Sequence, residues 1–320
     1  MRAGAGPATG GRMIPVIDWP LFTSGADRTG IVAALGQAAR VPGFFLVENH
    51  GVAPTLIQSA FAQAAAFFAL PKTQKEPLSI YTNPHNRGWA AMGTESLDET
   101  SKLVDQKEAF NVGYDMSADD PRVLAGELFR GVNLWPDLPE FQQVMLDYFT
   151  TVQAPGIDQH RAIALDLGLA EHSFAAHFSE PIATLRLLSY PAASGADAQI
   201  GAGAHTDYGS LTLLMTDGVP GLQVKPRSGD WIDVPHIDGA FVVNIGDCLM
   251  RWTNDLYVST PHRVLPPKKS RRSIAFFLDP NPDAIVTALP GTGPAKYGAI
   301  TGADYLRSRL DATYASPKKD

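Results

Sequence analysis

The segment from residue 201 to residue 216 reads G-A-G-A-H-T-D-Y-G-S-L-T-L-L-M-T, and it joins a polar motif to an apolar run. His205 and Asp207 are two positions apart, so on an extended strand their side chains point to the same face. The residues from Ser210 to Thr216 are mostly apolar, which predicts a short strand. The segment therefore predicts a β-scaffold that presents an imidazole and a carboxylate together.

Similar apolar runs fill the rest of the chain after Pro181, separated by Gly, Pro and Asp. The predicted strands are 185–190, 210–216, 221–225, 231–234, 241–245, 262–265 and 271–278. Short strands this close together are typical of a sandwich or jelly roll. We therefore predict a mainly β fold with flanking helices.

The part of the chain before Pro181 has a different pattern. Apolar spacing and the absence of helix breakers predict helices at 28–40, 54–70 and 139–167, with a kink or split at Pro155-Gly156. Short strands are predicted at 14–18 and 43–49, loops and short elements at 80–110, and a closing helix at 301–314. We predict a loose tail at 1–12 and one domain at 13–320. Within it, 13–180 is mostly helical, 181–290 is the jelly-roll core and 291–320 contains the last helix.

The composition limits the classes of function. Hydrophobic residues make up 45% of the 320 residues, and the formal net charge is −7, so we expect no nucleic-acid surface. No stretch reaches the about 18 apolar residues of a membrane span, so we expect no membrane contact. Cys248 is the single cysteine, which excludes a Cys-rich metal site and is consistent with a reducing cytoplasm.

A metal bound by His205 and Asp207 needs a third ligand, and His262 is the candidate, at the start of the predicted strand 262–265. Two His and one carboxylate on a β-scaffold form the facial triad of non-haem Fe(II) oxygenases. Three protein ligands leave three positions on one face of the octahedron, enough for a bidentate 2-oxo acid and O2. The same residue types also hold Zn²⁺ in hydrolases, so the triad alone leaves the metal open.

An anion site is predicted just beyond His262. Arg271 and Ser273 share one face of the predicted strand 271–278. A guanidinium gives a carboxylate two hydrogen bonds, and the hydroxyl adds a third donor. This pair therefore fits the distal carboxylate of 2-oxoglutarate.

The chain resembles the isopenicillin-N-synthase-like family of 2-oxoglutarate/Fe(II) oxygenases. The resemblance rests on the motif H-T-D at 205–207, followed by His262 and by the motif R-x-S at 271–273. The resemblance covers nearly the whole chain, including I-P-V-I-D at 14–18, G-F-F-L-V-E-N-H-G at 43–51 and S-T-P-H-R-V at 259–264. It implies a double-stranded β-helix (jelly roll) core, His205, Asp207 and His262 as iron ligands, and Arg271 and Ser273 as 2-oxoglutarate ligands. It further implies that Tyr190 supports the oxo acid.

The chain departs from the family pattern at Leu188, where plant members have Asn, and the plant N-Y-Y-P-P-C-P run is absent. A plant-type flavonoid or hormone substrate is therefore not indicated. The resemblance implies hydroxylation, desaturation or ring closure of a small molecule, with release of succinate and CO2. The candidate substrate contacts are Tyr208, Phe110, Trp252 and Arg186. An ordinary packing role is the alternative for the three aromatics, and a structural salt bridge is an equal alternative for Arg186.

Three other functions remain open at this point. Some family members, such as isopenicillin N synthase, use no 2-oxoglutarate and keep R-x-S for a substrate carboxylate. A metal-dependent hydrolase or isomerase could use a similar barrel, and a non-catalytic sensor could keep the pocket. The sequence does not indicate an oligomeric state.

Overall fold

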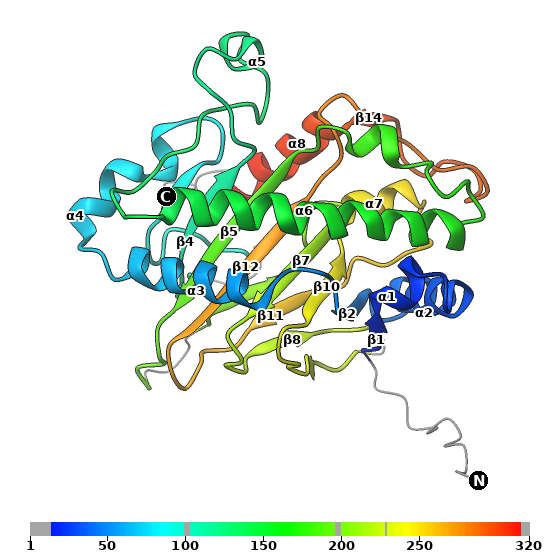
Figure 1. Ribbon diagram of the computed structural model, residues 1–320, viewed down its shortest axis with the longest axis horizontal. Helices are drawn as coiled ribbons and strands as arrows, with labels where there is room; N and C mark the ends of the chain where they lie inside the picture. The colour runs from blue at the N-terminus through cyan, green and yellow to red at the C-terminus, as the bar shows by residue number, and fades with distance from the viewer. Residues whose placement is uncertain (1–13, 99–102, 196–199, 228, 315–320) are drawn as a thin grey trace.

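The computed structural model describes residues 14–98, 103–195, 200–227 and 229–314, so the tail predicted at 1–12 lies outside the described residues. In this part of the chain, two sheets face each other and helices cover the outer face of the larger one (Figure 1).

The larger sheet has eight strands among the described residues, in the order β1-β2-β10-β7-β12-β5-β4-β3. The strands are β1 Val16–Asp18, β2 Phe44–Glu48, β3 Gly88–Ala90, β4 Glu108–Gly113, β5 Ala183–Tyr190, β7 Leu211–Thr216, β10 Phe241–Ile245 and β12 Arg271–Leu278. All neighbouring strands are antiparallel except β1 and β2, which run parallel.

The smaller sheet contains β6 Ala202–His205, β11 His262–Val264, β8 Leu222–Val224 and β9 Ile232–Asp233, in this order. The inner faces of both sheets contribute to one buried apolar cluster, with Phe44, Leu188 and Val242 from the larger sheet and Ala202, Val224 and Val264 from the smaller. Strands of alternating burial that share such a core form the predicted jelly roll, and that prediction is confirmed. A separate pair of strands, β13 Ile285–Val286 and β14 Ile300–Thr301, lies near the C-terminal end.

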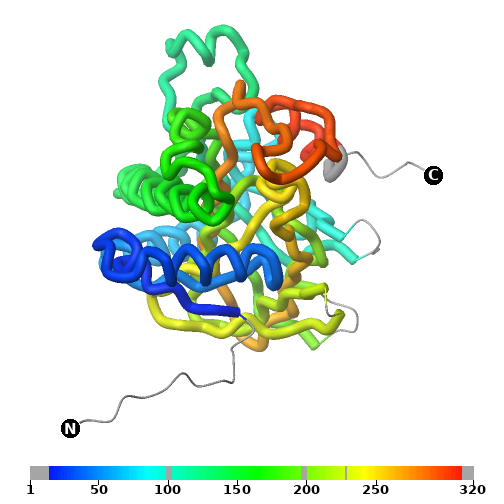
Figure 2. The backbone as a smooth tube through the Cα atoms, turned by 90° about the vertical axis from the view of Figure 1, so that its right-hand side faces the viewer, coloured from blue at the N-terminus to red at the C-terminus, as the bar shows by residue number. Residues whose placement is uncertain are grey.

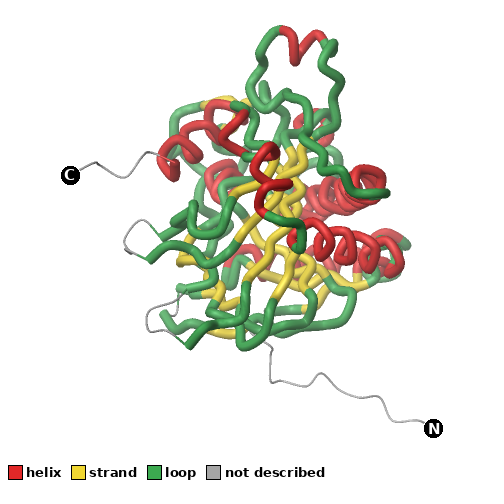
Figure 3. Tube along the Cα trace, turned by 90° about the vertical axis from the view of Figure 1, so that its left-hand side faces the viewer, coloured by secondary structure: helices red, strands yellow, loops and turns green. Residues whose placement is uncertain are grey.

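Helices pack on the outer face of the larger sheet. The α-helices are α1 Trp19–Thr23, α2 Arg28–Arg40, α3 Pro54–Phe68, α4 Lys72–Lys75, α5 Pro121–Leu124, α6 Phe141–Asp166, α7 Asp247–Trp252 and α8 Gly302–Tyr314. Short 3₁₀ turns are η1 Glu76–Leu78, η2 Ile80–Thr82 and η3 Ala175–Phe178. In Figure 1, α3 and α6 lie across the front of the large sheet, and Figures 2 and 3 show them on one side of the strands. Their apolar faces and the sheet bury the largest core cluster.

The long helix α6 corrects one prediction. It runs without interruption from Phe141 to Asp166, so the split expected at Pro155-Gly156 does not occur. A proline removes one helical hydrogen bond, but this loss does not end the helix here. A Cβ at Gly156 would lie 3.1 Å from Leu278 and 3.2 Å from Leu213, so the helix backbone lies close against the sheet here.

The N-terminal part supplies more of the sheet than the sequence predicted. Its helices and the strands β1 and β2 lie near the predicted positions, but it also contributes β3 and β4 to the eight-stranded sheet. The region 80–110 was expected to hold loops and short elements, and β4 begins near its end. None of the helices in the described residues combines the length and apolar character that a membrane span requires.

Candidate active site

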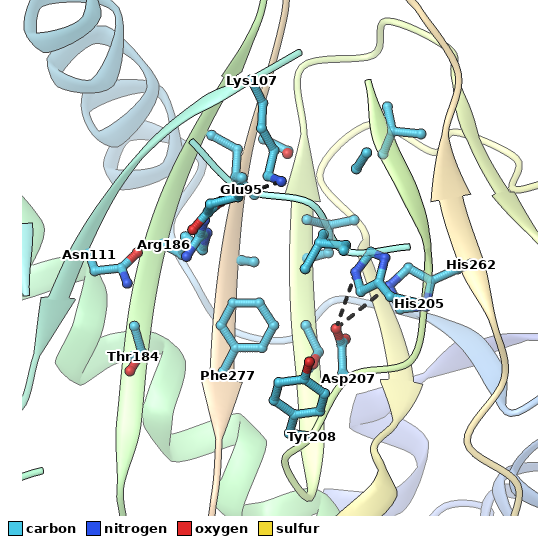
Figure 4. Close-up of a pocket in the computed structure, with 18 of the residues that line it drawn as sticks. Glu95, Lys107, Asn111, Thr184, Arg186, His205, Asp207, Tyr208, His262 and Phe277 are labelled. Atoms are coloured by element: carbon cyan, nitrogen blue, oxygen red, sulfur yellow. Dashed lines mark hydrogen bonds and ion pairs between the residues drawn. The ribbon is translucent and has the colours of Figure 1, made fainter. Parts of the chain in front are cut away.

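Three metal-binding side chains meet where β6 and β11 pair. His205 ends β6 and is directly opposite His262, the first residue of β11. Asp207 lies just beyond the end of β6 rather than on the strand, as the i, i+2 prediction assumed. Its Oδ1 is nevertheless 3.8 Å from His205 Nε2 and 3.6 Å from His262 Nε2 (Figure 4). The three residues could hold one metal ion, because their ligand atoms all lie within 4.8 Å of one another.

The hydrogen bonds of both imidazoles aim their Nε2 atoms at this point. His205 Nδ1 is 2.7 Å from the carbonyl oxygen of Gly203, and His262 Nδ1 is 3.2 Å from that of Thr260. A carbonyl oxygen only accepts, so we assign the proton of each ring to Nδ1. Each Nε2 then presents a lone pair, the arrangement that metal-ligating histidines adopt.

The charges of the triad also fit a divalent cation. Burial, together with the neighbouring His262 imidazole, lowers the pKa of His205 to about 3, so His205 is neutral near pH 7. Burial alone would raise the pKa of Asp207, but the two imidazoles and the Asn244 side chain hold it below its usual value. Asn244 Nδ2 donates to Asp207 Oδ2 over 2.8 Å, which leaves Oδ1 facing the histidines. Two imidazole nitrogens and one oriented carboxylate are a donor set that suits Fe(II).

An anion site lies on β12. Arg271 and Ser273 share the inner face of the strand, and Arg271 Nη1 donates to Ser273 Oγ over 3.3 Å. Arg271 is 1% exposed, its Nε donates to the Val219 carbonyl, and its guanidinium lies 5.0 Å from the ring centre of Tyr190 on β5. Among the described residues, no Asp or Glu forms an ion pair with Arg271. Its charge is therefore available to a ligand.

One cavity of about 840 Å³ joins the triad to this arginine. The predicted site residues that line it are His205, Asp207, Tyr208, His262, Arg271, Ser273, Tyr190 and Arg186. Leu188, the departure from the plant pattern, lies directly opposite Ser273 and also lines the cavity. The polar residues that the sequence placed far apart thus face one space of the size of a small-molecule site.

Phe110 and Trp252, two of the candidate substrate contacts, do not line this cavity and pack in the core instead. Phe110 is fully buried against Phe67, with ring centres 4.5 Å apart, because successive residues of β4 alternate between the sheet faces and Asn111 takes the cavity side. Trp252 ends α7 and is 1% exposed, with its ring 5.4 Å from that of Phe174. Both are core aromatics.

Arg186 forms the salt bridge that was one of its two predicted roles. It donates to Glu95 over 2.5 Å, and Lys107 lies 3.3 Å from the same carboxylate. Burial opposes ionisation of Glu95, but the two cations lower its pKa to about 2. Arg186 also lines the cavity, close to Asn111 and Thr184 in Figure 4, on the side away from the triad.

Sequence reasoning missed the cavity residues Glu95, Lys107, Asn111 and Asp279. The first three belong to a region with no clear alternation of apolar and polar residues. Asp279 directly follows the predicted strand 271–278, and continued alternation beyond Phe277 was the signal that could have found it.

The jelly roll, the His-Asp-His cluster and the unpartnered arginine together define a class of metal-dependent oxygenases, and comparisons with known proteins identify the family. Residues 14–138 match the family model for the N-terminal part of non-haem dioxygenases of morphine synthesis. Residues 170–280 match that of the 2OG-Fe(II) oxygenase superfamily. The chain is 35% identical over 315 residues to a 2-oxoglutarate-Fe(II) type oxidoreductase of Emericella nidulans, covering 94% of this chain and 90% of the relative.

Other relatives agree. The clavatol oxidase of Penicillium crustosum is 34% identical over 94% of this chain and 97% of its own length. A full-length Neurospora crassa protein solved with alpha-KG (2-oxoglutarate) and thymine has a TM-score of 0.85 and 34% identity, covering 96% of this chain and 99% of that one. The chain belongs to the 2OG-Fe(II) oxygenase superfamily. It is a 2-oxoglutarate- and Fe(II)-dependent dioxygenase, and these relatives do not support the oxidase that uses no 2-oxoglutarate.

Proposed function

We propose that His205, Asp207 and His262 hold Fe(II), and that Arg271 and Ser273 hold the distal carboxylate of 2-oxoglutarate with Tyr190 beside them. The observation that carries this proposal is Arg271, a buried cation that shares the triad's cavity and has no carboxylate partner among the described residues. A buried charge without a partner is costly, and a bound carboxylate removes that cost.

In this function the chain binds and orients its ligands. Asn244 fixes the Asp207 carboxylate, and the carbonyls of Gly203 and Thr260 fix the two imidazoles. When bound, Fe(II) and 2-oxoglutarate supply the O2-dependent oxidation that also converts the oxo acid to succinate and CO2. The buried walls of the cavity keep bulk water away from the reacting groups.

The substrate proposed here is a small organic molecule bound between the triad and Arg186. Figure 4 shows the rings of Phe277 and Tyr208 between these two groups, so the middle of the cavity offers flat apolar surfaces. The Neurospora crassa relative was solved with thymine, a molecule small and flat enough for such a space. Hydroxylation, desaturation and ring closure all remain compatible with these residues.

The test is an anaerobic titration of Fe(II) and then 2-oxoglutarate into the metal-free full-length protein, followed by the visible charge-transfer band of the chelate and by calorimetry. We expect the band with the unchanged protein, no band with His262→Ala, and a requirement for far more oxo acid with Arg271→Ala. Arg272→Ala is the matched control, because Arg272 adjoins Arg271 but does not line the cavity. Iron binding without a band would overturn the 2-oxoglutarate site, and no iron binding would overturn the triad.

A further inference from the structure

The inner face of β12 continues past the anion site to a carboxyl group that none of the roles above uses. Arg271, Ser273, Ala275 and Phe277 line the cavity at alternate positions, and Asp279 lines it too. Asp279 directly follows the last strand residue, and its backbone N–H donates to the Ile182 carbonyl over 2.8 Å, which continues the pairing with the segment before β5. At about 3.3 Å per residue, the carboxyl group lies at the end of the strand remote from Arg271.

The Asp279 side chain is buried without a partner. It is 5% exposed, and among the described residues no hydrogen-bond donor or cation contacts its carboxyl group. Burial, with the charge of Asp207 nearby, raises the pKa of Asp279 to about 7. A buried polar group that lacks a hydrogen bond costs free energy, so the position calls for a donor from elsewhere.

Gly209 leaves room for this carboxyl group. A Cβ at position 209 would lie 3.1 Å and 3.2 Å from the two Asp279 oxygens. Gly209 follows Asp207 and Tyr208 in the chain, so the carboxyl group lies close to the proposed metal ligand and to the Tyr208 ring. It is therefore placed at the part of the cavity where a substrate must approach the metal.

The other buried carboxyl groups of the cavity have protein partners. Glu95 is paired with Arg186 and Lys107, and Asp207 accepts from Asn244 and faces the two imidazoles. Asp279 differs from both, although it is equally enclosed. Structural ion pairing explains Glu95, and metal binding explains Asp207, but neither explains Asp279.

We propose that Asp279 is a specificity-determining residue that accepts a hydrogen bond from an N–H or O–H group of the substrate. This inference rests on the proposed function, because it places the substrate beside the same metal site. The cavity lining also includes the rings of Tyr208 and Phe277 and the α8 residues Leu306 and Leu310. The substrate class is therefore a flat cyclic molecule that carries a phenol, an amine or a ring N–H at this end, and no carboxylate there.

The experiment compares three probes of similar size, p-cresol, 4-methylanisole and 4-methylbenzoate. Each is titrated anaerobically into the full-length protein with Fe(II) and 2-oxoglutarate bound, and binding is measured by calorimetry. We expect p-cresol to bind at least about tenfold more tightly than the other two, the effect of one buried hydrogen bond to a carboxyl group. Asp279→Leu should abolish this preference, and Asp279→Asn, which keeps an acceptor oxygen, should retain part of it.

Two controls separate specificity from structure. Asp283→Asn changes an exposed carboxyl group outside the cavity and should leave all three affinities unchanged. Thermal unfolding of Asp279→Leu and Asp279→Asn should show no loss of stability, because the side chain has no protein partner. A marked loss in both variants would overturn the proposal in favour of a structural role.

The remaining outcomes are also decisive. Equal affinities for p-cresol and 4-methylanisole, tightest binding of 4-methylbenzoate, or no binding of any probe would each overturn the role of Asp279. Failure of the proposed function is distinguishable, because the unchanged protein would then fail to bind Fe(II) or 2-oxoglutarate before any probe is added.

Discussion

Arg271 on β12 and Arg186 on β5 face the same cavity from neighbouring strands, and their surroundings are opposite. Arg186 pairs with Ala275 in the register of the two strands, and Arg271 pairs with Tyr190, four positions along β12. The Arg186 guanidinium donates to Glu95 over 2.5 Å, whereas Arg271 has no ion pair with any described Asp or Glu.

Both arginines are largely shielded from solvent, since Arg271 is 1% exposed and the side chain of Arg186 is 13% exposed. The difference lies in the partner. The charge of a buried cation that pairs with a protein carboxylate is compensated within the fold, and a buried cation without such a partner is available to bind an anion. The comparison predicts that substitution of each arginine affects a different measurable quantity.

Among the predicted effects, we expect the largest to be the loss of stability caused by the substitution Arg186→Leu. The substitution removes a cation that pairs with the buried Glu95 carboxylate, which should lower the free energy of unfolding by about 3 kcal/mol. Urea unfolding of the metal-free protein measures this loss. The affinity for 2-oxoglutarate should stay within a factor of about two, because the oxo-acid site is remote.

The double variant Arg186→Leu/Glu95→Leu serves as the control. Replacing both members of a buried ion pair by apolar groups is often close to neutral, so most of the lost stability should return. A double variant as unstable as Arg186→Leu would show that this pairing is not the reason for the loss.

Arg271→Leu should weaken the binding of 2-oxoglutarate and leave the stability of the ligand-free protein intact. We expect the affinity for 2-oxoglutarate to fall about 100-fold, or about 2.7 kcal/mol, because a buried carboxylate loses its charge-assisted hydrogen bonds. Anaerobic calorimetry with Fe(II) measures the affinity. Unfolding without the oxo acid should require at least as much urea as before, and a clear destabilisation would break the contrast with Arg186.

Arg271→Lys sharpens the comparison further. It keeps the positive charge but loses the planar fork of donors, so we expect an intermediate fall of about tenfold in affinity for 2-oxoglutarate. The same titration measures it. An affinity equal to that of the unchanged protein would mean that charge alone holds the oxo acid.

The smallest expected effect is the contribution of Asp279 to the pH dependence of stability. Because its pKa is raised to about 7, the folded state binds more protons than the unfolded state between the ordinary carboxyl pKa and that value. Stability of the metal-free protein should therefore fall as pH rises through this window, by about 1 kcal/mol between about pH 6 and pH 8. Urea unfolding at both values, with Asp279→Asn as the comparison, tests this, and an equal fall in the variant would exclude Asp279 as the cause.

The sequence predicted the parts of the site that local alternation determines. Arg271 and Ser273 stand on a strand whose bounds were predicted correctly, so the shared face followed from spacing alone. His205, Asp207 and His262 do converge, although Asp207 lies in a loop. Their roles as ligands stay predictions until metal binding is measured.

Features that depend on contacts between distant segments of the chain could not be predicted from local alternation. The sequence of β4, E-A-F-N-V-G, shows no pattern that reveals which face is inward, so it did not separate the core residue Phe110 from the cavity residue Asn111. The Glu95–Arg186 pair joins residues 91 positions apart, and no local rule brings them together. The helix through Pro155 packs closely against Leu213 and Leu278, which lie far away in the chain.

The alternation along β12 has a consequence for how such enzymes diversify. Positions 271 and 273, proposed to hold the oxo acid, and the cavity positions 275 and 277 lie on one strand, and Asp279 directly follows it. Point substitutions at the far positions can alter the preferred substrate while the near positions still serve the same oxo acid. A single-residue insertion between positions 273 and 275 would instead turn the side chains on one side of the insertion away from the cavity. New substrate specificities should therefore arise here by substitution of residues and not by changes in the length of the strand.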